Sequence, residues 1–230
     1  MLKKIEYFGF VFVFALLFSG ILSYAHATNI DTTAYFHNNY GPFGLRNSIP
    51  TTFGQTFTVS GTDTTLDTFS LYLGERSGSG TGTLDLKGYI ASWDGEKAEN
   101  ILYASSIQTM NAEGTLQEFQ FSTGGLDLVA GNQYVAFLSV SGIEQDTGNA
   151  FMTPAGYAGY DGGKFVYLAR DENDFSLITT VNWYQYTYLD TWFKVDFSSN
   201  TNNTVPEPGT MILVGLGLAG LAGVRWKIQK

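Results

Sequence analysis

The sequence predicts an all-β fold: an antiparallel two-sheet sandwich, jelly-roll-like, flanked by an N-terminal signal-peptide helix and a short C-terminal transmembrane helix. Three observations support this. Apolar and polar residues alternate through the body, turn residues interrupt these runs often, and no body segment has helical periodicity. Many short strands with frequent turns are typical of sandwiches. We therefore expect a signal peptide at 1–27, a β-sandwich at 28–197, a polar linker at 198–204 and a membrane anchor segment at 205–230.

The first 27 residues have the layout of a secretory signal peptide. Lys3 and Lys4 give a positive start, residues 8–22 are apolar, and Ala25-His26-Ala27 forms an A-x-A cleavage site before Thr28. The alternative is an uncleaved membrane anchor. The A-x-A sequence favours cleavage by signal peptidase and export of the body.

The expected strands follow in chain order, each with apolar residues at every second position. These alternating sets are Phe69, Leu71 and Leu73; Leu84 and Leu86; Tyr89, Ala91 and Trp93; Phe119 and Phe121; and Phe193, Val195 and Phe197. The phase changes after Gly88, which predicts a β-bulge there. Residues 133–140 are apolar on both faces, which favours a central strand.

Composition excludes several classes of function. The chain has no cysteine, which removes thiol catalysis, thiolate metal sites and disulfides. Between residues 28 and 204 there are 19 Asp and Glu against 7 Lys and Arg, an excess of 12 negative charges (19 − 7). Nucleic-acid phosphates need neutralising cations, so we expect no nucleic-acid partner.

The C-terminal segment combines a stiff motif, an apolar run and a basic end. Pro206 and Pro208 are expected to hold the backbone of Val205-Pro206-Glu207-Pro208 in an extended conformation. The apolar run 211–224 would make about 21 Å of helix, short of the roughly 30 Å of a bilayer core. The cations that follow it are Arg225, Lys227 and Lys230, and the positive-inside rule keeps them in the cytoplasm. The body is then expected outside the cytoplasm.

These three parts in this order closely resemble the PEP-CTERM sorting signal of Gram-negative bacteria. The same tail has also been labelled an ice-binding-protein C-terminal domain. The resemblance implies processing by exosortase, a membrane peptidase, in organisms that often make exopolysaccharide. It implies insertion in the inner membrane, then release to the outer surface or the extracellular space. The basic end departs from the family, because Trp226, Ile228 and Gln229 interrupt it.

Catalytic and metal-binding signals are sparse in the body. Once His26 leaves with the signal peptide, His37 is the remaining histidine, and no G-x-S-x-G presents a serine. We expect a surface or packing role for His37 rather than catalysis. No cofactor is expected. The stretch 170–175 offers candidate oxygen ligands for calcium in Asp171, Asn173 and Asp174, with a solvated loop as the alternative.

Aromatic residues give the strongest binding signal. The stretch 181–192 holds Trp183, Tyr184, Tyr186, Tyr188 and Trp192, and in an extended strand the three tyrosines share one face. Flat rings with a polar tip suit stacking on sugars. The competing interpretation, which we favour, is cross-strand packing within the sandwich. Tyr157 and Tyr160 are candidates to extend the surface from a nearby loop.

Together these observations predict an exported, exosortase-sorted surface or matrix protein, more a binding or structural module than an enzyme. The candidate ligand is exopolysaccharide. The alternative is a polysaccharide hydrolase or lyase on the same sandwich, which would require two facing carboxylates, one with a raised pKa.

Overall fold

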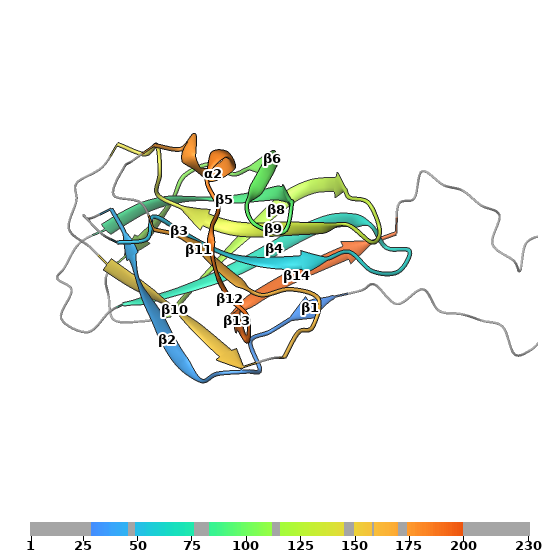
Figure 1. Ribbon diagram of the computed structural model, residues 1–230, viewed down its shortest axis with the longest axis horizontal. Coiled ribbons are helices and arrows are strands. Elements are labelled where there is room, and N and C mark those ends of the chain that lie inside the picture. The colour runs from blue at the N-terminus through green and yellow to red at the C-terminus, as the bar shows by residue number, and fades with distance from the viewer. Residues whose placement is uncertain are drawn as a thin grey trace, which may run out of the picture.

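The computed structural model describes residues 29–45, 49–75, 83–111, 116–144, 150–157, 159–169 and 174–199. In these residues the strands form two antiparallel sheets (Figure 1). The first sheet contains β1 (Ile30–Asp31), β2 (Asn38–Gly44), β4 (Thr65–Glu75), β8 (Gln117–Asp127), β10 (Ala150–Tyr157), β13 (Leu189–Thr191) and β14 (Phe193–Ser198). The second contains β3 (Thr52–Thr58), β5 (Thr83–Trp93), β6 (Ala98–Ala104), β7 (Gln108–Asn111), β9 (Gln133–Ser139), β11 (Phe165–Leu168) and β12 (Tyr184–Tyr186).

The chain crosses repeatedly between the two sheets, and their inner faces form the main core. The order along the second sheet is β12-β11-β3-β9-β5-β6, while β4 of the first sheet lies between β8 and β14. Across the interface, the ring centroid of Phe57 on β3 lies 5.6 Å from Phe193 and 6.2 Å from Phe197 on β14. Each such buried ring contributes about 1.5–3 kcal/mol. The predicted antiparallel two-sheet arrangement is confirmed, and its jelly-roll-like connection stays a prediction.

A second, smaller apolar cluster covers the outer face of the second sheet. Tyr89 and Trp93 of β5, Phe137 of β9 and Val166 of β11 point away from the main core. The segment that contains α2 (Leu177–Thr180) lies over them, and Trp183 completes the cluster. Strands β5, β9 and β11 are thus buried on both faces, which explains why residues 134–138 are apolar at successive positions.

The bulge predicted at Gly88 is absent from the pairing with β9, where β5 keeps unbroken register from Lys87 to Ser92. On the other edge of β5 the register changes by one residue across Gly88, from Leu86–Gln108 with β7 to Tyr89–Ala104 with β6. The apolar pattern changes because the second half of β5 packs on both faces. Position 88 favours glycine because a Cβ atom there would lie only 2.4 Å from the ring of Phe121.

The two ends of the chain fall outside the described residues. The predicted signal peptide at 1–27 and the segment 205–230 lie there, as does the linker apart from its first two residues, Ser198 and Ser199. Within the described ranges, no helix has the length and apolarity needed to cross a bilayer.

Candidate functional site: an aromatic cleft at the sandwich edge

Aromatic rings form a ladder on the last two strands of the second sheet. Tyr184 is paired with Tyr167, and Tyr186 with Phe165, across the antiparallel β11–β12 register. Their rings stack, with centroids 5.1 Å apart in the first pair and 5.3 Å apart in the second. Phe165 belongs to the main core, so this face of the ladder points toward the first sheet. Alternation along β12 therefore places both of its tyrosines on the inner face.

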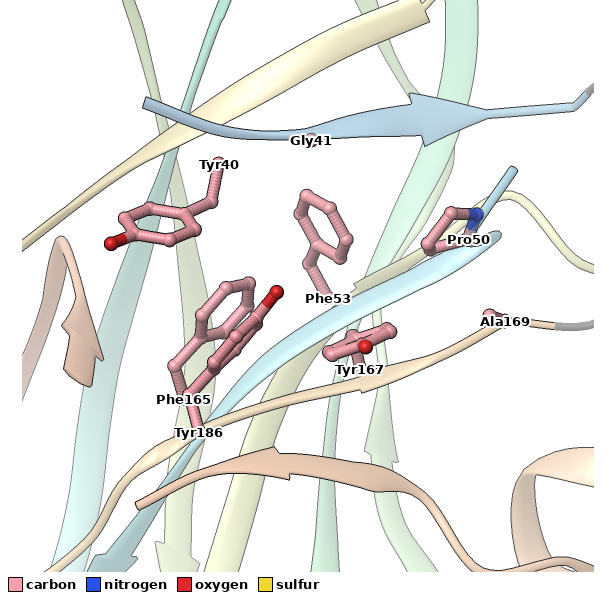
Figure 2. A pocket seen from close by; sticks show the side chains of 8 residues that line it. All are labelled: Tyr40, Gly41, Pro50, Phe53, Phe165, Tyr167, Ala169 and Tyr186. Atoms are coloured by element: carbon pink, nitrogen blue, oxygen red, sulfur yellow. The ribbon is translucent and has the colours of Figure 1, made fainter. Parts of the chain in front are cut away.

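The opposite wall comes from β2 of the first sheet. The ring of Tyr40 lies 5.6 Å from that of Tyr186 and 6.2 Å from that of Phe165. Figure 2 shows Tyr40 facing the rings of the second sheet across an open space. This hollow of about 240 Å³, which we call the aromatic cleft, is lined by Tyr40, Gly41, Pro50, Phe53, Phe165, Tyr167, Ala169 and Tyr186.

The cleft has a buried floor and an exposed rim. Phe53 and Phe165 are buried, and their rings meet edge to face 5.3 Å apart. Tyr186 is 37% exposed and its neighbour Tyr184 is 57% exposed, because β12 is the edge strand of its sheet. The tyrosine ladder thus has features of both interpretations of the sequence, cross-strand packing and an exposed surface for stacking on sugars. Its inner members pack in the core, while its outer members present ring surface to solvent.

The hydroxyls of Tyr40 and Tyr167 stay protonated at neutral pH. Burial raises the pKa of Tyr40, and the nearby Tyr157 and Tyr186 raise it further. Burial also raises the pKa of Tyr167, followed by the effect of Tyr186 and Tyr184. A protonated hydroxyl both donates and accepts hydrogen bonds. The cleft therefore offers polar tips beside its apolar ring faces.

The β5–β6 turn is pre-shaped by Asp94. Its Oδ1 accepts hydrogen bonds from the backbone nitrogens of Glu96 and Lys97, both at 2.7 Å. Its Oδ2 pairs with Lys97 Nζ at 2.9 Å. Gly95 adopts φ +105°, a conformation that L side chains rarely take. These interactions are exposed, so they fix the shape of the turn more than they stabilise the fold.

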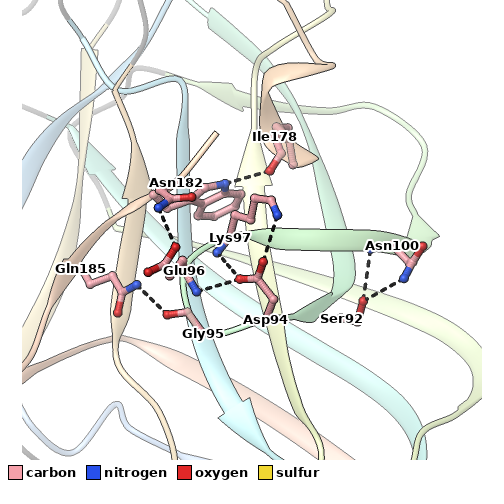
Figure 3. Close-up of polar contacts among 10 residues, drawn as sticks. Ser92, Asp94, Gly95, Glu96, Lys97, Asn100, Ile178, Asn182 and Gln185 are labelled. Atoms are coloured by element: carbon pink, nitrogen blue, oxygen red, sulfur yellow. Dashed lines mark hydrogen bonds and ion pairs between the residues drawn. The ribbon is translucent and has the colours of Figure 1, made fainter. Parts of the chain in front are cut away.

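The same turn holds the segment that leads into β12 (Figure 3). Trp183 N donates to Glu96 O at 2.9 Å, and Asn182 Nδ2 donates to Glu96 Oε2 at 2.7 Å. Gln185 Nε2 donates to Gly95 O at 2.9 Å. Since β12 has only three residue pairs with β11, these contacts help to place Tyr184 and Tyr186 at the cleft.

A buried carboxylate links the two sheets near the cleft. Asp190 on β13 is 3% exposed and accepts hydrogen bonds from Gln55 Nε2 on β3 at 2.6 Å, from Tyr160 N at 3.0 Å and from Gly159 N at 3.2 Å. Gln55 Oε1 in turn accepts from Thr191 N at 3.0 Å. Burial raises the pKa of Asp190, against the lowering effect of these hydrogen bonds.

The structure separates the five aromatic residues proposed from sequence. Trp183 is 4% exposed in the outer cluster, with its Nε1 donating to Ile178 O at 2.9 Å, so its faces are not free to stack on a ligand. Strand β12 ends at Tyr186, and Tyr188 lies in the following turn, 75% exposed. The expected single stripe of three tyrosines is therefore wrong.

Trp192 belongs to a different surface. It lies between β13 and β14, and its Nε1 donates to Tyr35 O at 2.8 Å. Its ring meets Phe36 and Tyr72 edge to face, at 6.0 and 5.8 Å. Trp192 therefore packs on the first sheet, and it is not among the residues that line the cleft.

Two loop tyrosines and His37 lie near the cleft. Tyr157 ends β10, is exposed, and has its ring centroid 4.1 Å from that of His37. Tyr160 is directed elsewhere: its hydroxyl accepts from Thr58 N at 3.0 Å and braces the loop after β10. Tyr157 can extend the tyrosine surface past Tyr40, whereas Tyr160 is a structural contact.

The candidate calcium ligands are only partly described. Asp171 and Asn173 lie outside the described residues. Asp174 is exposed, and its Oδ1 accepts from Ser176 N at 2.8 Å, which lowers its pKa. Among the described residues, no three His, Asp or Glu side chains are grouped so as to hold a metal ion. Calcium binding stays a prediction.

Sequence reasoning missed most of the cleft. Tyr40, Phe53, Phe165 and Tyr167 were not proposed as site residues, although they form its walls and floor. The short apolar run 165–168 is compatible with a buried strand but cannot show which strand lies beside it. Only the pairing of β11 with β12 and the facing position of β2 identify these residues as neighbours.

Comparison with known proteins bears on the C-terminal segment. A family described as the PEP-CTERM protein-sorting motif matches residues 204–226. The chain carries a PEP-CTERM protein-sorting motif. The matched residues include Val205, Pro206, Glu207 and Pro208, together with the apolar run and Arg225. This PEP-CTERM motif supports an exported, exosortase-sorted extracellular protein.

The body of the chain has a weak structural likeness to a solved structure. It is similar to the cysteine protease and lectin-like domains of Cwp84, a surface layer associated protein of Clostridium difficile, with 9% identity and a TM-score of 0.42. The match covers 65% of this chain and 32% of that chain. A likeness of this size carries no information about function. No curated protein matches the chain in sequence.

Proposed function

We propose that this PEP-CTERM protein is a surface or extracellular-matrix protein whose jelly-roll-like sandwich binds glycan, exopolysaccharide included, in the aromatic cleft. The observation that carries the proposal is the open ladder on β12. Tyr184 and Tyr186 keep ring faces in solvent next to a hollow of about 240 Å³. Apolar ring surface beside hydroxyl donors matches the two kinds of surface that a sugar presents.

The proposed route to the surface uses both ends of the chain. Signal peptidase removes residues 1–27, the run 211–224 holds the protein in the inner membrane, and exosortase processes the segment at Val205–Pro208. Arg225, Lys227 and Lys230 retain the tail in the cytoplasm until then. The mass of the mature protein from an exosortase-bearing host tests this route, because a Pro206→Ala, Glu207→Ala variant should keep its C-terminus.

The binding proposal is tested with the purified full chain by affinity electrophoresis in gels that contain dissolved polysaccharides. One aromatic contact is worth about 0.5–1.5 kcal/mol beyond its buried area. Since about 1.4 kcal/mol is a factor of ten, Tyr186→Ala should weaken retention up to about tenfold, or more with the lost area. Tyr188→Ala is the matched control, because it removes an exposed tyrosine that does not line the cleft.

The outcomes separate the candidate functions. Retention that Tyr186→Ala lowers and Tyr188→Ala leaves unchanged supports the cleft as a binding site. Equal retention of both variants would refute this location. The hydrolase or lyase alternative predicts shortened products after incubation. The eight residues of the lining include no carboxylate, and both Asp190 oxygens accept hydrogen bonds, so the cleft offers no acid-base pair of its own.

A further inference from the structure

All eight residues that line the aromatic cleft are uncharged: five are tyrosines or phenylalanines, and the other three are Gly41, Pro50 and Ala169. Two cations are next to lining residues in the sequence. Lys164 precedes Phe165, and Arg170, which follows Ala169, lies outside the described residues. None of the eight lining residues itself carries a charge that could neutralise an acidic group on a ligand.

The surroundings of the cleft carry negative charge instead. Asp190 accepts a hydrogen bond from Gln55, whose strand partner on β11 is the lining residue Phe165, and the charge of Asp161 adds to the burial that raises the pKa of Asp190. The body as a whole holds the excess of 12 negative charges between residues 28 and 204. A negative field of this kind lowers the local concentration of anions. It leaves the local concentration of neutral ligands unchanged.

An anionic sugar would meet two further penalties in this cleft. A carboxylate or sulfate loses water on entry, and burying a charge without a partner is costly. The faces of aromatic rings carry the negative end of the ring quadrupole, which attracts cations and repels anions. A neutral pyranose has neither penalty, because its C–H face stacks on a ring and its hydroxyls reach the tyrosine tips.

We propose, on the basis of the glycan-binding function above, that the aromatic cleft selects neutral polysaccharides built of flat-faced pyranoses and rejects uronic-acid or sulfated chains. The hollow of about 240 Å³ lies below the roughly 300–1,000 Å³ of sites for drug-sized ligands. Its volume is about that of one sugar ring, which would lie beside the Tyr40–Tyr186 pair, since these two rings are in contact at 5.6 Å between centroids. The exposed ring of Tyr184 then supports the neighbouring sugar outside the hollow.

The test measures the affinity of the purified full chain for two sets of polymers. Neutral probes are mixed-linkage β-glucan and galactomannan, and acidic probes are alginate and polygalacturonate. We expect retention by at least one neutral polymer and none by the acidic pair. Neutral binding should change less than about twofold between low and high salt, because no ion pair is available for salt to screen.

A charge variant tests the reason for the selectivity. Ala169 lines the cleft, and Ala169→Lys should admit acidic polymers while lowering neutral retention little. The matched control is Leu102→Lys, which adds the same charge at an exposed position on β6, outside the cleft lining. A gain of acidic binding in Ala169→Lys alone confirms that the missing cation sets the preference.

The failures of the two proposals are distinguishable. Acidic polymers bound as tightly as neutral ones by the wild-type chain would overturn the selectivity and leave glycan binding intact. Retention of neutral polymers that Tyr186→Ala does not lower would overturn the cleft as the site. Retention of none of the four polymers, and of no exopolysaccharide from an exosortase-bearing host, would overturn both proposals.

Discussion

The buried carboxylate of Asp190 gives a prediction in which opposing effects can be separated. The substitution Asp190→Asn keeps the shape of the side chain but turns one oxygen into a donor. Gln55 Oε1 already accepts from Thr191 N, so the amide of Gln55 cannot rotate to compensate. The new amide therefore faces either Gln55 Nε2 or the backbone nitrogens of Gly159 and Tyr160.

The magnitude follows from the donors left without an acceptor. Each unsatisfied buried group costs about 1–3 kcal/mol, so one or two of them cost about 1–6 kcal/mol, and the removal of a buried charge offsets part of this cost. Stabilities of domains this size are about 5–15 kcal/mol, so the loss is measurable. The assay is urea unfolding of the full chain followed by tryptophan fluorescence. Glu99→Gln is the control, because it removes a negative charge from an exposed side chain on β6 that is not among the groups that shift the pKa of Asp190.

The pH dependence decides which effect dominates at Asp190. Burial raises its pKa in the folded state above the ordinary value of 3.8, so the folded protein holds the proton more tightly than the unfolded chain. The stabilisation from this group is complete below 3.8 and is lost as pH rises through the raised pKa. Asparagine does not titrate, so the cost of Asp190→Asn should shrink as pH rises through this window. A cost that grows with pH would show that the hydrogen bonds outweigh burial, and would refute this reasoning.

Two further predictions concern the outer cluster. Trp183→Ala should lower the free energy of unfolding by about 3–5 kcal/mol, because it empties a buried site against Trp93 and Phe137, and urea unfolding measures this loss; a change below about 1 kcal/mol would contradict the packing. Burial raises the pKa of Tyr89 from 10.0 to about 12, so stability should fall as pH rises through that interval, and less so in Tyr89→Phe. Tyrosinate absorbance checks this, and a Tyr89 that ionises near 10 in the folded protein would contradict it.

Some properties follow from the sequence alone because they depend on local composition. The β class follows from alternation such as that of Phe193, Val195 and Phe197, all of which lie in the core. The sorting motif at residues 204–226 is read from residue type and order without knowledge of the fold. The aromatic stretch was also visible, and two of its members, Tyr184 and Tyr186, do lie at the cleft.

Other properties were decided only by tertiary structure, because they depend on which strands become neighbours. Nothing local to residue 183 shows that the chain folds its indole under α2 while Tyr184, one position later, faces the opposite side of the sheet. Strand pairing brings Tyr167 to Tyr184, and sheet packing brings Tyr40 to Tyr186 from a distant part of the chain. Side chains alternate faces, so the sequence supplied candidate rings, while register and sheet contact determined which of them form a site.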